Sequence, residues 1–175
     1  MANLDRKMGF KPKNIKNADS NRYLIATSQV TRHGDVIRMG TSGLVRGTSS
    51  GTTAPIVGIQ NGAIIDETDG AVNATAVSGD IISVWDDPNE VFVAQIASHQ
   101  QTDAYVTRTT SLCFDEAGSA GAQYIDDAAS SLDSFKVMRA SYEENGARST
   151  TGTYANVECR INPVKHLYGV AGVTS

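Results

Sequence analysis

The sequence predicts an all-β protein: a compact β-barrel or β-sandwich of roughly nine to eleven short strands with an extended N-terminal arm. Short apolar and β-branched runs recur along the 175 residues, separated by turn-forming residues that include 16 Gly. No window of about 11 residues or more repeats its apolar positions with the 3.6-residue period of a helix. The hydrophobic content of 40% is ordinary for a folded protein, so the chain has the material for a core.

The first twenty residues differ from the rest in pattern and charge. Residues 1–16 hold five basic residues and one acidic residue, a net charge of +4, whereas the remainder holds ten basic and eighteen acidic residues, a net charge of −8. Gly9 and Pro12 interrupt any regular element. We therefore expect residues 1–20 to form an extended basic arm and residues 21–175 a single β-domain.

The first half of the body contains five apolar runs that are typical of short strands. They are residues 22–27 (RYLIAT), 36–39 (VIRM), 44–45 (LV), 56–60 (IVGIQ) and 63–65 (AII). The last two flank Asn61-Gly62, which is the strongest short hairpin signal, so we expect a tight turn between them. Residues 66–71 (DETDGA) indicate an exposed acidic turn.

The segment from Gly79 to Ile96 has the clearest local pattern in the chain. Two apolar runs flank Asp-Asp-Pro-Asn-Glu at residues 86–90. Pro88 suits the second position of a type I turn and Asn89 the third, with Asp87 able to cap the turn from the first. Both faces of the runs are apolar, so we expect a β-hairpin or tight strand connection whose strands are covered on both sides.

The second half of the body contains four further strand candidates. They are residues 112–114 (LCF), 124–129 (YIDDAA), 135–140 (FKVMRA) and 154–162 (YANVECRIN), of which the second and third are expected to pair. In the last candidate Ala155, Val157, Cys159 and Ile161 share one face, and Asn156, Glu158 and Arg160 the other. One short helix has two candidate positions, residues 99–106 and 125–131.

The sequence contains no recognisable catalytic or metal-binding motif. The nucleophile-elbow and phosphate-loop patterns are absent, and His33, His99 and His166 are isolated in sequence. Cys113 and Cys159 are too few for a disulfide framework or a zinc site, so we expect two reduced thiols. We therefore predict that the protein is not an enzyme and has no catalytic residue, no metal site and no cofactor.

Acidic clusters are the one feature that suggests acid–base chemistry. Asp86, Asp87 and Glu90 form the densest of them. No calcium-loop pattern surrounds these carboxylates, and we interpret them as turn-forming and solubilising residues on an exposed tip. A small β-barrel enzyme that uses one of them as acid or base is the weakest alternative.

The basic arm is the candidate binding element. Phe10 is its only aromatic residue and the body is acidic, so we expect the arm to bind an acidic protein surface or a neighbouring copy rather than nucleic acid. No apolar run approaches the roughly 20 residues that span a bilayer, and we expect no membrane partner. The predicted contact residues are Arg6, Lys7, Met8, Phe10, Lys11, Lys13, Ile15 and Lys16.

Three motifs in this order resemble the capsid decoration (cement) proteins of tailed bacteriophages. The first is MANLDRKMGFKPKNI, followed by NRYLIA and GDVIRM; the second is VWDDPNEVFVAQI; the third is TGTYANVECRINPVKHLYG. The resemblance implies a structural virion protein that binds the outer surface of the capsid and bridges neighbouring subunits of the major capsid protein. It carries no catalytic residue to this chain.

The same resemblance implies an oligomer and a location. The resemblance implies a symmetric oligomer that sits at a local symmetry axis of the shell. We expect a homotrimer first and a dimer second. We expect assembly in the host bacterial cytoplasm, which the low Cys content suits, and residence on the outer capsid surface. The alternative is a receptor- or glycan-binding virion module of tail or fibre with Trp85, Tyr105 and Tyr142 as an aromatic platform, although Trp85 is expected in the core.

Overall fold

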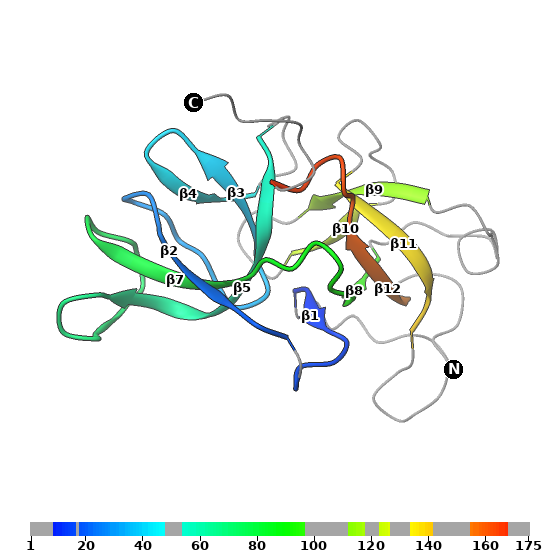
Figure 1. Cartoon of the computed structure of the whole chain (residues 1–175), viewed down its shortest axis with the longest axis horizontal. Helices are drawn as coiled ribbons and strands as arrows, with labels where there is room; N and C mark the ends of the chain where they lie inside the picture. Colours follow the sequence, from blue (N-terminus) through cyan, green and yellow to red (C-terminus); the bar gives the residue numbers. More distant parts are fainter. Residues whose placement is uncertain are drawn as a thin grey trace.

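The computed structural model describes residues 9–16, 18–47, 54–96, 112–117, 123–126, 134–141 and 155–167, with the backbone alone at 112–117, 126 and 140. These residues form twelve strands and no helix (Figure 1). Accordingly, nothing in the described ranges is a helix long and apolar enough to cross a membrane.

Two antiparallel sheets make up the fold. The first sheet has the strand order β1-β8-β12-β11-β9-β10, and the second has the order β2-β7-β5-β3-β4, with β6 paired to β5. Figure 1 shows the first sheet on the right and the second on the left. The strands of the first sheet are Lys11–Pro12 (β1), Phe92–Gln95 (β8), Asn156–Ile161 (β12), Phe135–Ala140 (β11), Leu112–Ala117 (β9) and Tyr124–Asp126 (β10). Those of the second are Asn21–Leu24 (β2), Asp80–Trp85 (β7), Ile56–Asp66 (β5), Val36–Gly40 (β3), Gly43–Arg46 (β4) and Val72–Asn73 (β6).

The predicted all-β class is confirmed, and the architecture is sandwich-like. Isolated bridges join Ile25 to Leu44 and Ile96 to Ile125, but neither extends into a ladder. The described strands therefore do not close a barrel. The arrangement has one to three strands more than expected, and β1 and β6 are two-residue strands without an apolar run of their own.

The core consists of two apolar clusters that share the central strands of the second sheet. Side chains that are neighbours in sequence point to opposite clusters. In β5, Ile56 belongs to the first cluster and Val57 to the second. In β7, Trp85 belongs to the first cluster and Val84 to the second. The first cluster also contains Phe92, Phe135, Val157 and Ile161 of the first sheet, and so joins the two sheets. Both faces of β7 are thus buried, as the two-sided apolar pattern of residues 79–96 predicted.

The segment from Gly79 to Ile96 is a tight strand connection and not a hairpin. β7 pairs with β2 and β5, whereas β8 pairs with β1 and β12, so the chain crosses from one sheet to the other between them. The predicted turn chemistry is confirmed. The Glu90 N–H donates to the Asp87 carbonyl at 3.1 Å, and the Asn89 N–H donates to Asp87 Oδ1 at 2.8 Å. The local sequence determines the turn, but the two flanking strands pair with strands of different sheets and not with each other.

The prediction of a tight turn at Asn61-Gly62 is wrong. β5 runs without interruption from Ile56 to Asp66, and its register against β7 shifts between Asn61 and Ile65. Gly62 has φ of +91°, a left-handed conformation that glycine adopts without strain. The dipeptide therefore forms a bulge rather than a reversal, because β7 pairs with both halves of the long strand.

The remaining strand predictions differ from the structure mainly in which strands pair with each other. Residues 124–129 and 135–140 were expected to pair, but β9 lies between β10 and β11. Residues 125 and 126 belong to β10 rather than to a helix, while 99–106 and 127–131 lie outside the described residues. The acidic turn at 66–71 is confirmed, since the Asp66 N–H donates to the Ala71 carbonyl at 2.8 Å and residues 67–71 are exposed.

Candidate functional site

The predicted arm lies on the body from Gly9 onward. Phe10 is completely buried, and its ring stacks on Phe135 with centroids 4.5 Å apart and planes 19° apart. β1 then pairs with β8, and the Lys13 N–H donates to the Val91 carbonyl at 2.7 Å. Gly9, with φ of +74°, passes so close to Gly34 that a Cβ would lie 2.8 Å from the Gly34 carbonyl oxygen. This segment is an edge strand of the first sheet.

A buried carboxylate fixes the same segment from its other side. Glu158 is 3% exposed, and its Oε2 lies 3.0 Å from Lys13 Nζ and 2.8 Å from Arg139 Nε. Lys13 comes from the N-terminal segment, Arg139 from β11 and Glu158 from β12. The polar face expected for the last strand therefore meets cations of the chain itself, since a buried carboxylate is stable only when it is paired.

The predicted contact residues therefore separate into distinct groups. Phe10 belongs to the core, and Lys13 is bound to Glu158. Lys11, Ile15 and Lys16 are exposed, and Ile15 keeps 66% of its surface in solvent. Arg6, Lys7 and Met8 lie outside the described residues.

A hollow of about 540 Å³ separates this segment from the turn after β7. Lys13 and Asn14 line one side, and the other is lined by residues of the turn: Asp87, Asn89, Glu90 and Val91. Partial burial raises the pKa of Glu90, and the Asp87 carboxylate adds to this effect, while a hydrogen bond from the Val91 backbone opposes it. We call the exposed residues Lys11, Asn14, Ile15, Lys16, Asp87 and Asn89, together with the half-buried Glu90, the arm–turn surface. Its mixed charges and one apolar side chain suit contact with a protein.

Asp86 does not lie on the exposed tip with its neighbours. It is 6% exposed, accepts hydrogen bonds from Asn21 Nδ2 at 3.0 and 2.9 Å, and also accepts one from the Tyr23 hydroxyl. These bonds hold β2 against the end of β7. The expectation of three clustered carboxylates is therefore corrected: Asp86 is structural, while Asp87 and Glu90 face the hollow.

The other candidate reactive residues are structural where the structure describes them. His33 accepts a hydrogen bond from the Gly62 N–H at 3.0 Å, and its ring meets the edge of Trp85. His166 is completely buried, which lowers its pKa although contacts with the Val57 and Asp86 backbones oppose the shift. Cys159 is a buried free thiol whose pKa burial raises. Within the described residues, no three His, Cys, Asp or Glu side chains are placed to hold a metal ion.

Of the three residues of the proposed aromatic platform, the structure describes Trp85 alone. Trp85 is 2% exposed and belongs to the core, as its position in a strand predicted. Tyr105 and Tyr142 lie outside the described residues, as do His99 and the side chain of Cys113. Trp85 is therefore unavailable to stack on a glycan.

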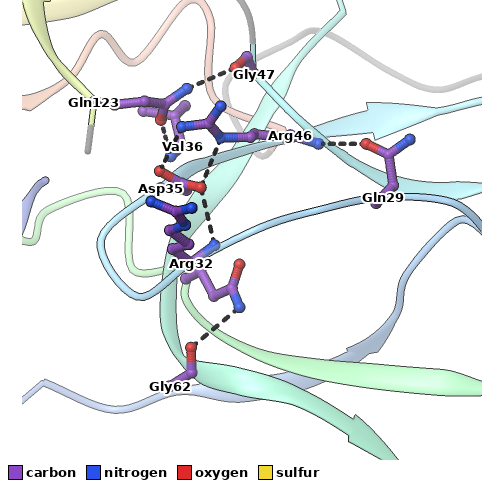
Figure 2. A network of polar contacts seen from close by, with 9 residues as sticks. Gln29, Arg32, Asp35, Val36, Arg46, Gly47, Gly62 and Gln123 are labelled. Carbon is purple, nitrogen blue, oxygen red and sulfur yellow. Dashed lines mark hydrogen bonds and ion pairs between the residues drawn. The ribbon is translucent and has the colours of Figure 1, made fainter. Parts of the chain in front are cut away.

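A buried polar network that the sequence did not reveal joins the two sheets (Figure 2). Asp35 is 1% exposed, and its carboxylate contacts Arg46 Nε at 2.6 Å and Arg46 Nη2 at 3.1 Å. Gln123, which precedes β10, accepts a hydrogen bond from the Val36 N–H and donates to the Gly47 carbonyl at 2.6 Å. No local pattern in the sequence marked Gln123 as a neighbour of Val36 and Gly47.

Comparison of the chain with protein-family models, curated proteins and solved structures finds no match in any of the three.

Proposed function

We propose that this protein is a structural virion protein that binds the outer surface of a tailed-phage capsid and stabilises it by bridging neighbouring major capsid protein subunits. The proposal rests on the three ordered motifs and on the form of the arm–turn surface. The observation that carries it is the exposure of Lys11, Ile15 and Lys16 on the segment whose Lys13 and Asn14 line a hollow together with the turn at Asp87–Glu90. Such a surface offers charged groups and an apolar anchor that are already ordered.

Prior ordering reduces the entropy that binding costs. Phe10 is held in the core and Lys13 by Glu158, so residues 11–13 have little conformational freedom left to lose. Many copies on one shell then add weak contacts through effective concentration. The carboxylates of Asp87 and Glu90 beside the lysines disfavour a nucleic-acid backbone, which is consistent with a protein partner.

Charge and apolar substitutions on the arm–turn surface test this proposal. We expect the Ile15→Asp, Lys16→Glu double variant to lose binding to assembled shells of the major capsid protein, measured by co-sedimentation. Val164→Asp, Lys165→Glu is a matched control, because Val164 is 65% exposed and Ile15 66%. The control should bind like the wild type.

These substitutions are preferable to deletion of residues 2–16, because deletion would remove Phe10 from the core. Circular dichroism and thermal melting should show both double variants folded to the same extent. Full-strength shell binding by the Ile15, Lys16 variant would refute the role of the arm–turn surface. Absence of wild-type binding to any shell surface would refute the proposed function itself.

A further inference from the structure

The Asn61-Gly62 bulge of β5 is a sequence motif that the proposed function leaves unused. The register of β5 against β7 shifts after Asn61, and Gly62 has φ of +91°. Gly62 is exposed, and no described atom lies within 4 Å of the position that a Cβ on it would take. The residue after Asn61 therefore puts no side chain in the way of the Asn61 amide.

His33 contacts the backbone nitrogen of this bulge. The Gly62 N–H donates a hydrogen bond to His33 Nδ1 at 3.0 Å. Because Nδ1 accepts this bond, it carries the lone pair of the neutral imidazole, and the ring proton sits on Nε2. The exposed His33 ring meets Trp85 edge-on at a centroid distance of 5.3 Å, which helps to fix its position.

The chemical identity of this acceptor distinguishes Gly62 from an ordinary residue of a sheet. A backbone carbonyl, the usual acceptor in a ladder, holds the N–H but does not take its proton. An imidazole nitrogen can take the proton, and histidine is the commonest general base in enzymes. The 3.0 Å distance also lies within the roughly 2.6–3.2 Å at which a general base acts.

The matching electrophile belongs to the preceding residue. A bond between the Gly62 nitrogen and the amide carbon of Asn61, Cγ, closes a five-membered ring, so both reacting atoms are already close to each other. Asn61 Nδ2 lies 3.4 Å from Ser20 Oγ, and Gln60 Nε2 donates to the Gly62 carbonyl at 3.1 Å. These contacts restrain the reacting pair on both sides of the new bond.

We propose that Asn61 is a self-modification site, at which His33 is the base that promotes conversion of Asn61 to aspartate and isoaspartate. His33 Nδ1 takes the proton of the Gly62 N–H while the nitrogen forms a bond to Asn61 Cγ. The Cγ–Nδ2 bond then breaks, and the Nδ2 group leaves as ammonia with the proton that His33 held. Water opens the resulting cyclic imide at either carbonyl, which gives aspartate or isoaspartate.

The reaction changes the protein once and turns over no external substrate, so it is not an enzymatic activity. Both products add a negative charge beside Ser20, and isoaspartate also adds a carbon to the backbone of β5. The inference does not depend on shell binding, because the isolated chain holds every reacting group except water.

Incubation of the full chain at fixed pH and temperature, followed by peptide mapping with mass spectrometry, tests the proposal. We expect the folded protein to convert Asn61 faster than the same chain denatured in guanidinium chloride, with both aspartate and isoaspartate formed. His33→Gln keeps a side-chain acceptor near Gly62 but removes the base, and it should slow the conversion at least about tenfold. Arg32→Gln, at the exposed neighbouring position, is the matched control and should react like the wild type.

Asn145-Gly146, the second Asn-Gly pair of the sequence, is an internal standard in the same peptide maps. His33→Gln should leave its rate of conversion unchanged. An unchanged rate at Asn61 in this variant, or equal slowing at both pairs, would overturn the role of His33. A folded wild type that converts Asn61 no faster than the denatured chain would overturn the site itself, and this comparison needs no variant to fold.

Discussion

The rings of Phe10 and Phe135 stack with centroids 4.5 Å apart and planes 19° apart. Phe10 comes from the basic N-terminal segment and Phe135 from β11, so this contact joins two parts of the chain that are distant in sequence. Both rings are completely buried. The segment that displays the lysines is therefore anchored in the core of the fold.

Phe10→Ala should lower the free energy of unfolding by about 3–5 kcal/mol, because it removes a buried ring and leaves a cavity. Phe10→Leu should cost less, since it retains more of the side-chain volume. Urea denaturation followed by Trp85 fluorescence measures both. Ile15→Ala, at an exposed position of the same segment, should change stability by no more than about 0.5 kcal/mol. Equal stability of Phe10→Ala and wild type would show that the segment is not part of the cooperative core.

Replacing both cations around Glu158 should destabilise the fold more than replacing the carboxylate. Lys13→Met with Arg139→Met leaves the buried carboxylate without these two partners, at a cost of about 3 kcal/mol. Glu158→Gln should cost about 1 kcal/mol, because both cations are partly exposed and water can solvate them. Chemical denaturation measures the loss of stability in each variant. A larger loss in Glu158→Gln than in the double variant would contradict this account.

Gln123→Ala should destabilise the junction of the two sheets by about 1–3 kcal/mol, because it removes the side-chain partner of the Val36 N–H and the Gly47 carbonyl. Hydrogen exchange at the Val36 amide should accelerate in this variant. Gln29→Ala is the control, since the Gln29 side chain accepts a longer bond, of 3.2 Å, from the Arg46 N–H at a part-buried site. An unchanged exchange rate at Val36 would argue against the bridge.

His166 should make the protein less stable in mild acid. Burial lowers its pKa in the fold below the ordinary value of 6.5, so the unfolded chain takes up this proton first as the pH falls. Stability is then lost from about pH 6.5 down to the lowered pKa of the folded state. His166→Gln should reduce the dependence of the melting temperature on pH in this range, measured by thermal melts at a series of pH values. An identical slope in variant and wild type would contradict the assignment.

Local structure was largely predictable from the sequence. Strands such as β3, β11 and β12 follow from β-branched and apolar runs, and the turn at Asp87–Glu90 follows from the preferences of Pro88 and Asn89. These features depend on backbone sterics and on hydrogen bonds between near neighbours, which a short window of sequence contains. The alternation in the last strand likewise identified its buried face correctly.

Pairing and site assembly were not predictable in the same way. Asn61-Gly62 has the composition of a hairpin turn but lies within β5, because a partner strand extends past it. Phe10 and Lys13 looked like contact residues of a free arm, but the Phe135 ring and the Glu158 carboxylate hold them on the body.

The sequence by itself determined that this protein is built from short strands and turns and that its N-terminus is basic. Only the tertiary structure decided which strands are neighbours, which lysines face solvent and which carboxylates are buried. The physical reason is that these outcomes depend on competition among contacts distant in sequence, whose energies exceed the local preferences of any one segment.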